Sequence, residues 1–498
     1  MVQGQIAKGA IISYVAIFLN IAITFFYTPW MIRQIGVSDY GLYSLTSTFI
    51  AYFIIDFGLA GAIARFIAKY RAEGRQDKVE NMLGLTTKIY LFIDCLIFAV
   101  LFVCYFFLTD IFKGLTNEEL EKLKVLYVIA GSFSILSFVL HPMNGAMMAY
   151  EYFVENKLLD MFQRVGTVVL IVIALLLKGS VFELVFITGS IGFLSSVAKF
   201  VIFKYKSKIH INWKFYDKNE TRILLTFSFW VFINSLAQGL RLTMMPTVLG
   251  ALANSTQISV FSIGMTIEAM VYTLSSALNG LFLPKVTRMI HGDNGPKEVT
   301  DLMIKVGRLQ LYILSLILLG FLLIGDVFIK LWIGEDFHYS YYVVILLTLV
   351  NLVSMTQSIA GDMVYAENRI KYVALFTLGS SSLSLIIAVL LASRFGAVGC
   401  AVAYFIAMSF NMFIVNIFLN NSLKIEIGRF FRNCHYKILP SLLLITVLFF
   451  LIKILIDINN WLSLVLFTST FVIFYLLVCY FFLFNEEEKR IVQIVKLK

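Results

Sequence analysis

The chain has 498 residues, of which 60% are hydrophobic and only 14% are charged, whereas soluble domains carry about 25% charged residues. This composition excludes an ordinary cytosolic enzyme, a disordered scaffold and a secreted disulfide-linked protein. The formal net charge of +10 fits basic loops beside a membrane better than a nucleic-acid interface, so no nucleic-acid partner is expected. Charge-free stretches such as 9–32 and 458–485 exceed the roughly 20 residues that a membrane-spanning helix needs.

The apolar stretches predict an all-α polytopic membrane protein with about fourteen membrane-spanning helices. The region between the third and fourth helices, around 109–124, has the pattern of a short polar helix. The predicted spans are approximately 10–32, 41–64, 83–108, 125–149, 158–177, 181–203, 223–249, 256–283, 302–325, 340–363, 372–393, 396–420, 437–457 and 461–484.

The basic residues are distributed unequally between the two sides of this arrangement. With the N-terminus inside, the inner loops and tails hold most of the lysines and arginines, for example around Arg71, Lys208 and Lys424. The outer loops hold only Arg33, Lys113, Lys122, Lys124, Lys178, Lys330 and Arg394. Because cytoplasmic loops are enriched in Lys and Arg, both termini are expected in the cytoplasm. The expected location is the bacterial cell (inner) membrane.

A weak internal repeat relates the ends of the first and seventh helices. At a constant offset, Pro29 matches Pro246 and Ser38 matches Ser255, with apolar matches between them. A repeat separated by an even number of spans is parallel, which places a substrate path between the two halves. The expected organisation is an N-terminal lobe (1–217), a C-terminal lobe (218–436) and two extra C-terminal helices with a cytoplasmic tail (437–498).

Two segments near the N-terminus resemble a known family. Arg33–Leu45 reads RQIGVSDYGLYSL, and Asp56–Gly74 reads DFGLAGAIARFIAKYRAEG. Both resemble the polysaccharide-biosynthesis branch of the MOP exporter superfamily, the Wzx-type flippases; this superfamily also includes the MATE exporters. The resemblance implies two six-helix lobes around a central cavity that opens alternately to the two membrane faces.

The same resemblance implies a substrate and its partners. The substrate would be a polyprenyl-diphosphate-linked oligosaccharide repeat unit, moved from the inner to the outer leaflet for O-antigen or capsule assembly. Membrane lipid, a coupling ion (H⁺ or Na⁺) and a polysaccharide polymerase are the other candidate partners. The alternative is a MATE-like, cation-coupled exporter of small amphipathic compounds.

Polar residues recur at helical spacing within four of the predicted spans. Because polar groups are costly in the bilayer, they are expected to line the cavity, although interhelical hydrogen bonds would also explain them. The predicted lining residues are Ser13, Asn20, Thr24, Asp56, Asn234, Gln238, Arg241, Glu268, Tyr272 and Asn279.

Embedded charges leave several interpretations open. Arg241 either grips a diphosphate or an acidic sugar, or forms an internal ion pair with Glu268. Asp56 and Asp94 either take up a coupling ion or have a structural role, in which they cap a broken helix or pair with Lys88 or Arg65. Arg164, Glu183, Lys199 and Lys453 are read as residues near span ends that reach the interface, and His141-Pro142 as a kink.

Motifs for chemistry are missing from the sequence. It has no P-loop, no H-E-x-x-H and no nucleophile elbow, and the five cysteines lack metal-ligand spacing. No cofactor, metal or catalytic residue is therefore predicted. A membrane-embedded polymerase or ligase would need a large outer loop, and every predicted outer loop is short.

Overall fold

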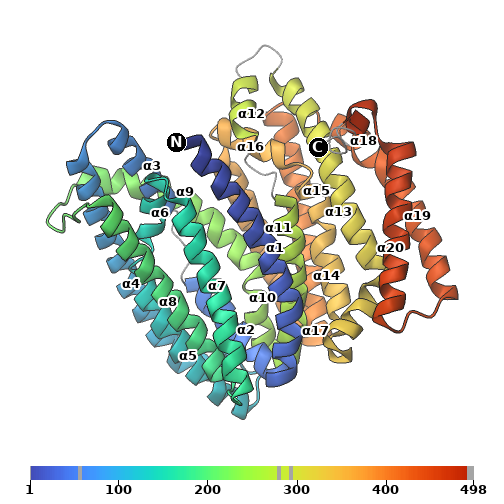
Figure 1. Cartoon of the computed structure of the whole chain (residues 1–498), viewed down its shortest axis with the longest axis horizontal. Helices are drawn as coiled ribbons and strands as arrows, with labels where there is room; N and C mark the ends of the chain where they lie inside the picture. The colour runs from blue at the N-terminus through green and yellow to red at the C-terminus, as the bar shows by residue number, and fades with distance from the viewer. Residues whose placement is uncertain (1, 54–58, 277–281, 291–294, 491–498) are drawn as a thin grey trace. The chain divides into compact units, whose positions relative to one another are not determined.

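A computed structural model of the chain (Figure 1) describes residues 2–53, 59–276, 282–290 and 295–490, and this part is helical without any strand. The predicted all-α class is confirmed. The helices are α1 (Val2–Ile35), α2 (Val37–Phe53), α3 (Leu59–Ala72), α4 (Gln76–Ile111), α5 (Asn117–Phe138), α6 (Pro142–Ala149), α7 (Phe153–Leu176), α8 (Val181–Ser207), α9 (Lys218–Leu242), α10 (Met245–Leu252), α11 (Ser255–Ser276), α12 (Leu283–Ile290), α13 (Gly295–Ile333), α14 (Ser340–Leu349), α15 (Asn351–Ser354), α16 (Ser358–Ala366), α17 (Ile370–Ser422), α18 (Ile427–Asn433), α19 (His435–Leu455) and α20 (Trp461–Val478), with a 3₁₀ turn (Glu335–Phe337) and a π turn (Cys479–Leu483).

Within the described residues, nine helical segments are long and apolar enough to cross a membrane. One of them is α17, whose 53 residues include Gly396 at a non-helical φ of 53°, so that two helices meet there. The protein is thus a multi-pass membrane protein, and the count of fourteen stays a prediction. The nine segments are Gln76–Ile111, Asn117–Ala149, Phe153–Leu176, Val181–Ser207, Gly295–Ile333, Glu335–Ser354, Ile370–Ser422, Ile427–Leu455 and Trp461–Leu483.

Local sequence explains where several helices begin. Thr116 caps α5: its hydroxyl accepts from the Glu119 amide at 3.3 Å, and the Glu119 carboxylate accepts from the Thr116 amide at 2.9 Å. The polar segment predicted around 109–124 is therefore partly the capped first turns of α5. Further along, α5 ends at Phe138 and α6 begins at Pro142, which confirms the predicted kink, since a proline is accommodated best in the first turn of a helix and an interior one kinks or breaks it.

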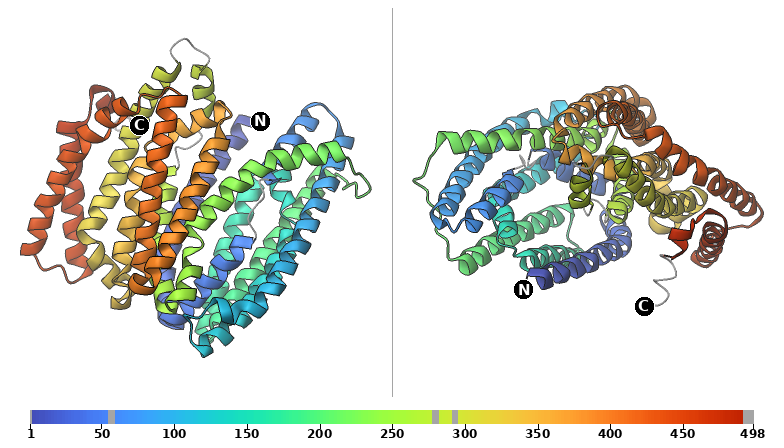
Figure 2. Two further views of the ribbon diagram at one scale, coloured as in Figure 1. Left: turned by 180° about the vertical axis from the view of Figure 1, so that it is seen from behind. Right: turned by 90° about the horizontal axis from the view of Figure 1, so that it is seen from above.

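The chain divides into two compact units. Unit 1 comprises Met1–Ser259 and Thr377–Gly396, and unit 2 comprises Val260–Phe376 and Ala397–Lys498. The lobe boundaries predicted at 217 and 436 stay predictions. In unit 1, α1 packs against α7, α7 against α8, α8 against α5, α5 against α2, and α2 against α1. These five helices close a ring, and α3, α4 and α6 pack together beside it (Figures 1 and 2).

In unit 2, α13 is the central helix and contacts α14, α16, α18, α19 and α20. The last two membrane helices are joined to it by polar contacts as well as by an apolar core. Arg308 of α13 donates to both carboxylate oxygens of Glu488, at 2.6 and 2.9 Å, and to the carbonyl of Leu483 at 2.9 Å. Lys453 of α19 lies 2.8 Å from Asp326 of α13. Lys453 is therefore half of an ion pair.

Replacing Arg308 by alanine should strongly destabilise unit 2. The Arg308 and Glu488 side chains are only 9% and 5% exposed, so the variant leaves a buried carboxylate without its cation. Removing one partner of a buried ion pair costs about 3–5 kcal/mol. Thermal unfolding of the purified protein in detergent measures the loss, and the double variant Arg308→Ala with Glu488→Gln should recover part of it. A single variant as stable as the parent would contradict this role.

Candidate functional site

A polar contact joins α1 and α7 inside unit 1. The Arg164 guanidinium, near the midpoint of α7, donates from Nη2 to the hydroxyl of Thr24 on α1 at 3.2 Å. Thr24, a predicted lining residue, is buried and donates in turn to the carbonyl of Asn20 at 2.7 Å. The structure therefore adds a cation to the polar stripe that the sequence predicted on the first span.

Arg164, interpreted from the sequence as a residue that reaches the interface, lies near the midpoint of α7 and bonds to a neighbouring helix. Its position relative to the membrane interface stays a prediction. Asp160, one turn earlier on α7, is engaged by Lys199 of α8 at 2.8 Å. Within the described residues Arg164 forms no ion pair, although its side chain is exposed. An exposed cation on an apolar helix is stabilised by water or by an anion, so the geometry suits anion binding.

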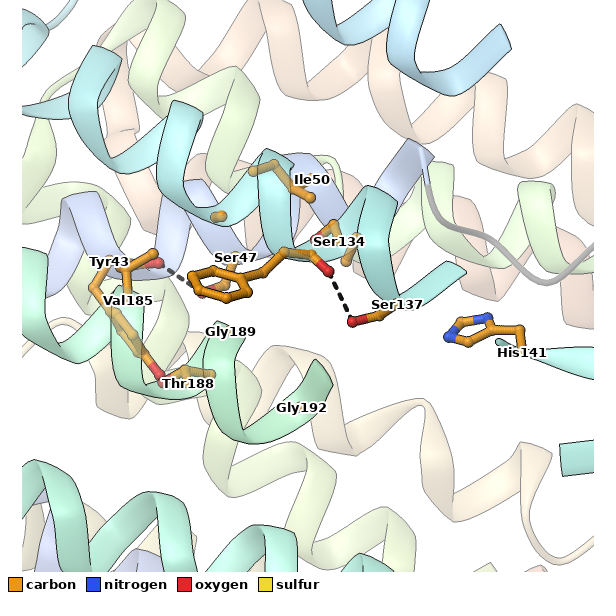
Figure 3. A pocket seen from close by; sticks show the side chains of 13 residues that line it. Tyr43, Ser47, Ile50, Ser134, Ser137, His141, Val185, Thr188, Gly189 and Gly192 are labelled. Carbon is orange, nitrogen blue, oxygen red and sulfur yellow. Dashed lines mark hydrogen bonds between the residues drawn. The ribbon is translucent and has the colours of Figure 1, made fainter. Parts of the chain in front are cut away.

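Tyr27 connects this cation to a second polar region. Its hydroxyl is buried without a hydrogen-bond partner among the described residues, and it lies on α1, which packs against both α7 and α2. Tyr43 of α2 in turn lines a cavity of about 360 Å³ between α2, α5 and α8. We call this cavity the hydroxyl chamber after its polar lining residues Tyr43, Ser47, Ser134, Ser137 and Thr188 (Figure 3).

The remaining predicted lining residues are distributed over several elements. Asn234, Gln238 and Arg241 lie on α9, at spacings that place them on one helical face. Tyr272 lies on α11 and is 44% exposed. Asp56, Asn279 and the side chain of Ser13 lie outside the described residues. The role of all ten residues as cavity lining stays a prediction.

Two embedded acids have different surroundings. Glu268 on α11 is buried and accepts from the amide of Asn351 at 2.8 Å, at the start of α15. An ion pair between Glu268 and Arg241 stays a prediction, because the two residues belong to different units. Asp94 on α4 is buried without a hydrogen-bond partner in the described part of the chain. Lys88, its suggested partner, donates instead to the carbonyl of Phe215.

The carboxylate of Glu119 joins three helices of the chain, α5, α2 and α11. Glu119 of α5 accepts from Ser38 of α2 at 2.6 Å and, through the same oxygen, from Ser255 of α11. We call Ser38, Glu119 and Ser255 the serine clamp. Backbone packing reinforces it: Ser259 donates to the Val37 carbonyl at 2.6 Å, and a β-carbon on Gly41 would collide with the Ser255 carbonyl.

The serine clamp brings together the two serines that the repeat had paired. Ser38 follows the first predicted span and Ser255 follows the seventh, so equivalent positions of the two predicted lobes share one carboxylate. The repeat offset could have suggested an equivalent environment for the serines. Nothing in the sequence indicated Glu119, since its pattern is already explained by helix capping.

Comparison with known families matches residues 6–290 to the family described as polysaccharide biosynthesis protein. A search of curated proteins found no match. The matched region covers more than half of the chain and includes both segments on which the sequence resemblance rested, so that resemblance is confirmed.

Solved transporters share the fold. A lipid II flippase MurJ in an inward closed conformation superposes with a TM-score of 0.70 at 17% identity, covering 95% of this chain and 99% of that one. An inward-facing multidrug resistance MATE transporter gives a TM-score of 0.59 at 13% identity, covering 80% and 95%. A MOP superfamily transporter from Pyrococcus furiosus gives 0.54 at 12% identity, covering 82% and 95%. At these identities the likeness establishes the MOP transporter fold alone.

Proposed function

Because the chain belongs to the polysaccharide biosynthesis protein family, we propose that it flips a polyprenyl-diphosphate-linked oligosaccharide repeat unit from the inner to the outer leaflet. The product would feed the assembly of a surface polysaccharide such as O-antigen or capsule. The MOP transporter fold supports a transport step over a chemical one.

The observation that carries this proposal is the contact between Arg164 and Thr24. A diphosphate head group bears the charge that is hardest to move through hydrocarbon about 30 Å thick. Arg164 offers a guanidinium near mid-helix whose one hydrogen bond within the described residues goes to an uncharged hydroxyl, and guanidinium geometry matches phosphate oxygens. In the proposed cycle the Arg164 guanidinium holds the diphosphate while the polyprenyl tail remains in lipid.

The proposed setting is a bacterial inner membrane with both termini in the cytoplasm, as the basic loops predict. An H⁺ or Na⁺ gradient is a candidate energy source, and Asp94 is a candidate coupling group because its buried carboxyl lacks a described partner. A polysaccharide polymerase would receive the flipped unit on the outer side.

Flipping also requires that one membrane face stays closed while the other is open. We assign this closure on the outer side to the serine clamp, because it ties corresponding hairpins of the two predicted lobes to one carboxylate. The chain passes from unit 1 into unit 2 along α11, only a few residues after Ser255. If the outer face opens by separation of the predicted lobes 1–217 and 218–436, the Ser255–Glu119 hydrogen bond must break, although all three clamp residues belong to unit 1.

Deletion of the gene tests the function directly. Lipid-linked repeat units should accumulate on the cytoplasmic leaflet, and surface polysaccharide should disappear. The measurement is extraction of lipid-linked oligosaccharide from the deletion strain, combined with an accessibility assay that reports the leaflet. The strain must lack a second flippase, and a plasmid copy of the gene provides the control.

An unchanged surface glycan without accumulated intermediate would overturn the proposal. It would favour the small-molecule exporter, for which the superposed MATE transporter provides a fold precedent. In that case the deletion strain should instead become sensitive to amphipathic cations.

A further inference from the structure

The hydroxyl chamber has a lining that selects for one kind of ligand. Its described walls combine hydroxyl groups, the His141 imidazole, the Phe133 ring and small residues, and no Asp, Glu, Lys or Arg is among these described lining residues. Figure 3 shows Tyr43 and Thr188 at one end and His141 at the other. A volume of about 360 Å³ lies within the range of small-molecule pockets.

The hydrogen-bonding state of the hydroxyls determines what they offer to a ligand. Ser47 donates to the Tyr43 carbonyl at 2.9 Å, Ser137 to the Phe133 carbonyl at 2.7 Å, and Thr188 to the Leu184 carbonyl at 2.7 Å. These three hydroxyl protons are thus committed to the backbone of their own helices, while their oxygen lone pairs remain available, and the hydroxyls of Tyr43 and Ser134 can donate as well as accept. The chamber therefore offers several hydrogen-bond acceptors together with donors, which suits the hydroxyl groups of a sugar.

Charged ligands fit this lining poorly. An anionic sugar would find no Lys or Arg among the described lining residues to balance its carboxylate, and an organic cation would find no Asp or Glu among them. The Phe133 ring offers a flat apolar wall, and Gly189 permits its position because a β-carbon there would collide with the ring. A flat apolar surface beside several acceptors matches a sugar ring, which has C–H faces and a rim of hydroxyls.

We propose that the hydroxyl chamber is the subsite for an uncharged sugar residue of the head group, close to the diphosphate bound by Arg164. The inference rests on the proposed flippase function and adds a requirement to it: the sugar near the diphosphate must be neutral. The two subsites are neighbours in unit 1, because a β-carbon on Gly192 of the chamber would lie 3.5 Å from the side chain of Gln163, the residue before Arg164, and α8 packs against α7.

The test is binding of three soluble probes to the purified full-length protein. The probes are a short-chain prenyl diphosphate without sugar, the same compound carrying one neutral hexose, and the same compound carrying one uronic acid. The hexose should tighten binding at least about tenfold over the bare diphosphate, since each added hydrogen bond contributes about 1 kcal/mol, and the uronic acid should not.

The triple variant Ser47→Ala, Ser137→Ala and Thr188→Val should abolish the gain from the hexose and leave binding of the bare diphosphate unchanged. The matched control is Ser132→Ala, an exposed serine of α5 that makes the same backbone hydrogen bond outside the chamber. Equal hexose gain in parent and triple variant, or a preference for the uronic acid, would overturn the proposal. Failure of all three probes to bind would instead overturn the function on which it rests.

Discussion

Replacing Arg164 by alanine should reduce transport of the lipid-linked oligosaccharide by about 10- to 100-fold while the protein inserts at normal levels. The expected size follows from the loss of hydrogen bonds to a charged group, each contributing about 1.5–3 kcal/mol. Arg164→Lys should restore only part of the rate, because an ammonium cannot bind two phosphate oxygens as a planar fork does. The measurement is the flipping rate in proteoliposomes of known protein content.

Thr24→Val separates anion binding from helix packing. This variant keeps the shape of the side chain but removes the hydroxyl that accepts from Arg164. If Arg164 only ties α7 to α1, Thr24→Val and Arg164→Ala should lower thermal stability to a similar extent. If Arg164 binds the diphosphate, Thr24→Val should retain most transport. Normal transport in Arg164→Ala would exclude the substrate role.

Locking the serine clamp should stop transport altogether. Cysteines at Ser38 and Ser255, introduced into a chain without the five native cysteines, can be joined by a short thiol-specific cross-linker. Both serines bond to one oxygen of Glu119, so their side chains lie close together before the reaction. Transport in proteoliposomes should fall to background after cross-linking and return when the reagent is reduced.

The matched control joins cysteines at Ser38 and Thr116 with the same reagent. Thr116 also contacts Glu119, but Ser38 and Thr116 both belong to the first predicted lobe, so this link should leave transport intact. Mass spectrometry establishes the extent of cross-linking in both proteins. Full transport through a completely linked Ser38–Ser255 pair would show that the clamp does not need to open.

The class of the protein, its family and several helix boundaries were already determined by the sequence. The amino-acid composition of a chain indicates whether it folds in water or in a lipid bilayer, because long apolar stretches without charge are stable only in lipid. The kink at Pro142 and the cap at Thr116 depend only on residues within a few positions of each. Sequence patterns therefore predicted the kink itself and the polar segment that contains the cap.

The site depended on contacts that sequence spacing cannot express. Arg164 could have faced the membrane interface, and only the packing of α7 on α1 places its guanidinium against Thr24, 140 residues away in the chain. Glu119 satisfies a local capping pattern, yet its carboxylate also binds serines 81 and 136 residues away. The hydroxyl chamber needs three helices, none of which alone shows a binding pattern. A helix sequence determines which side chains share a face, whereas the tertiary structure decides what each face meets.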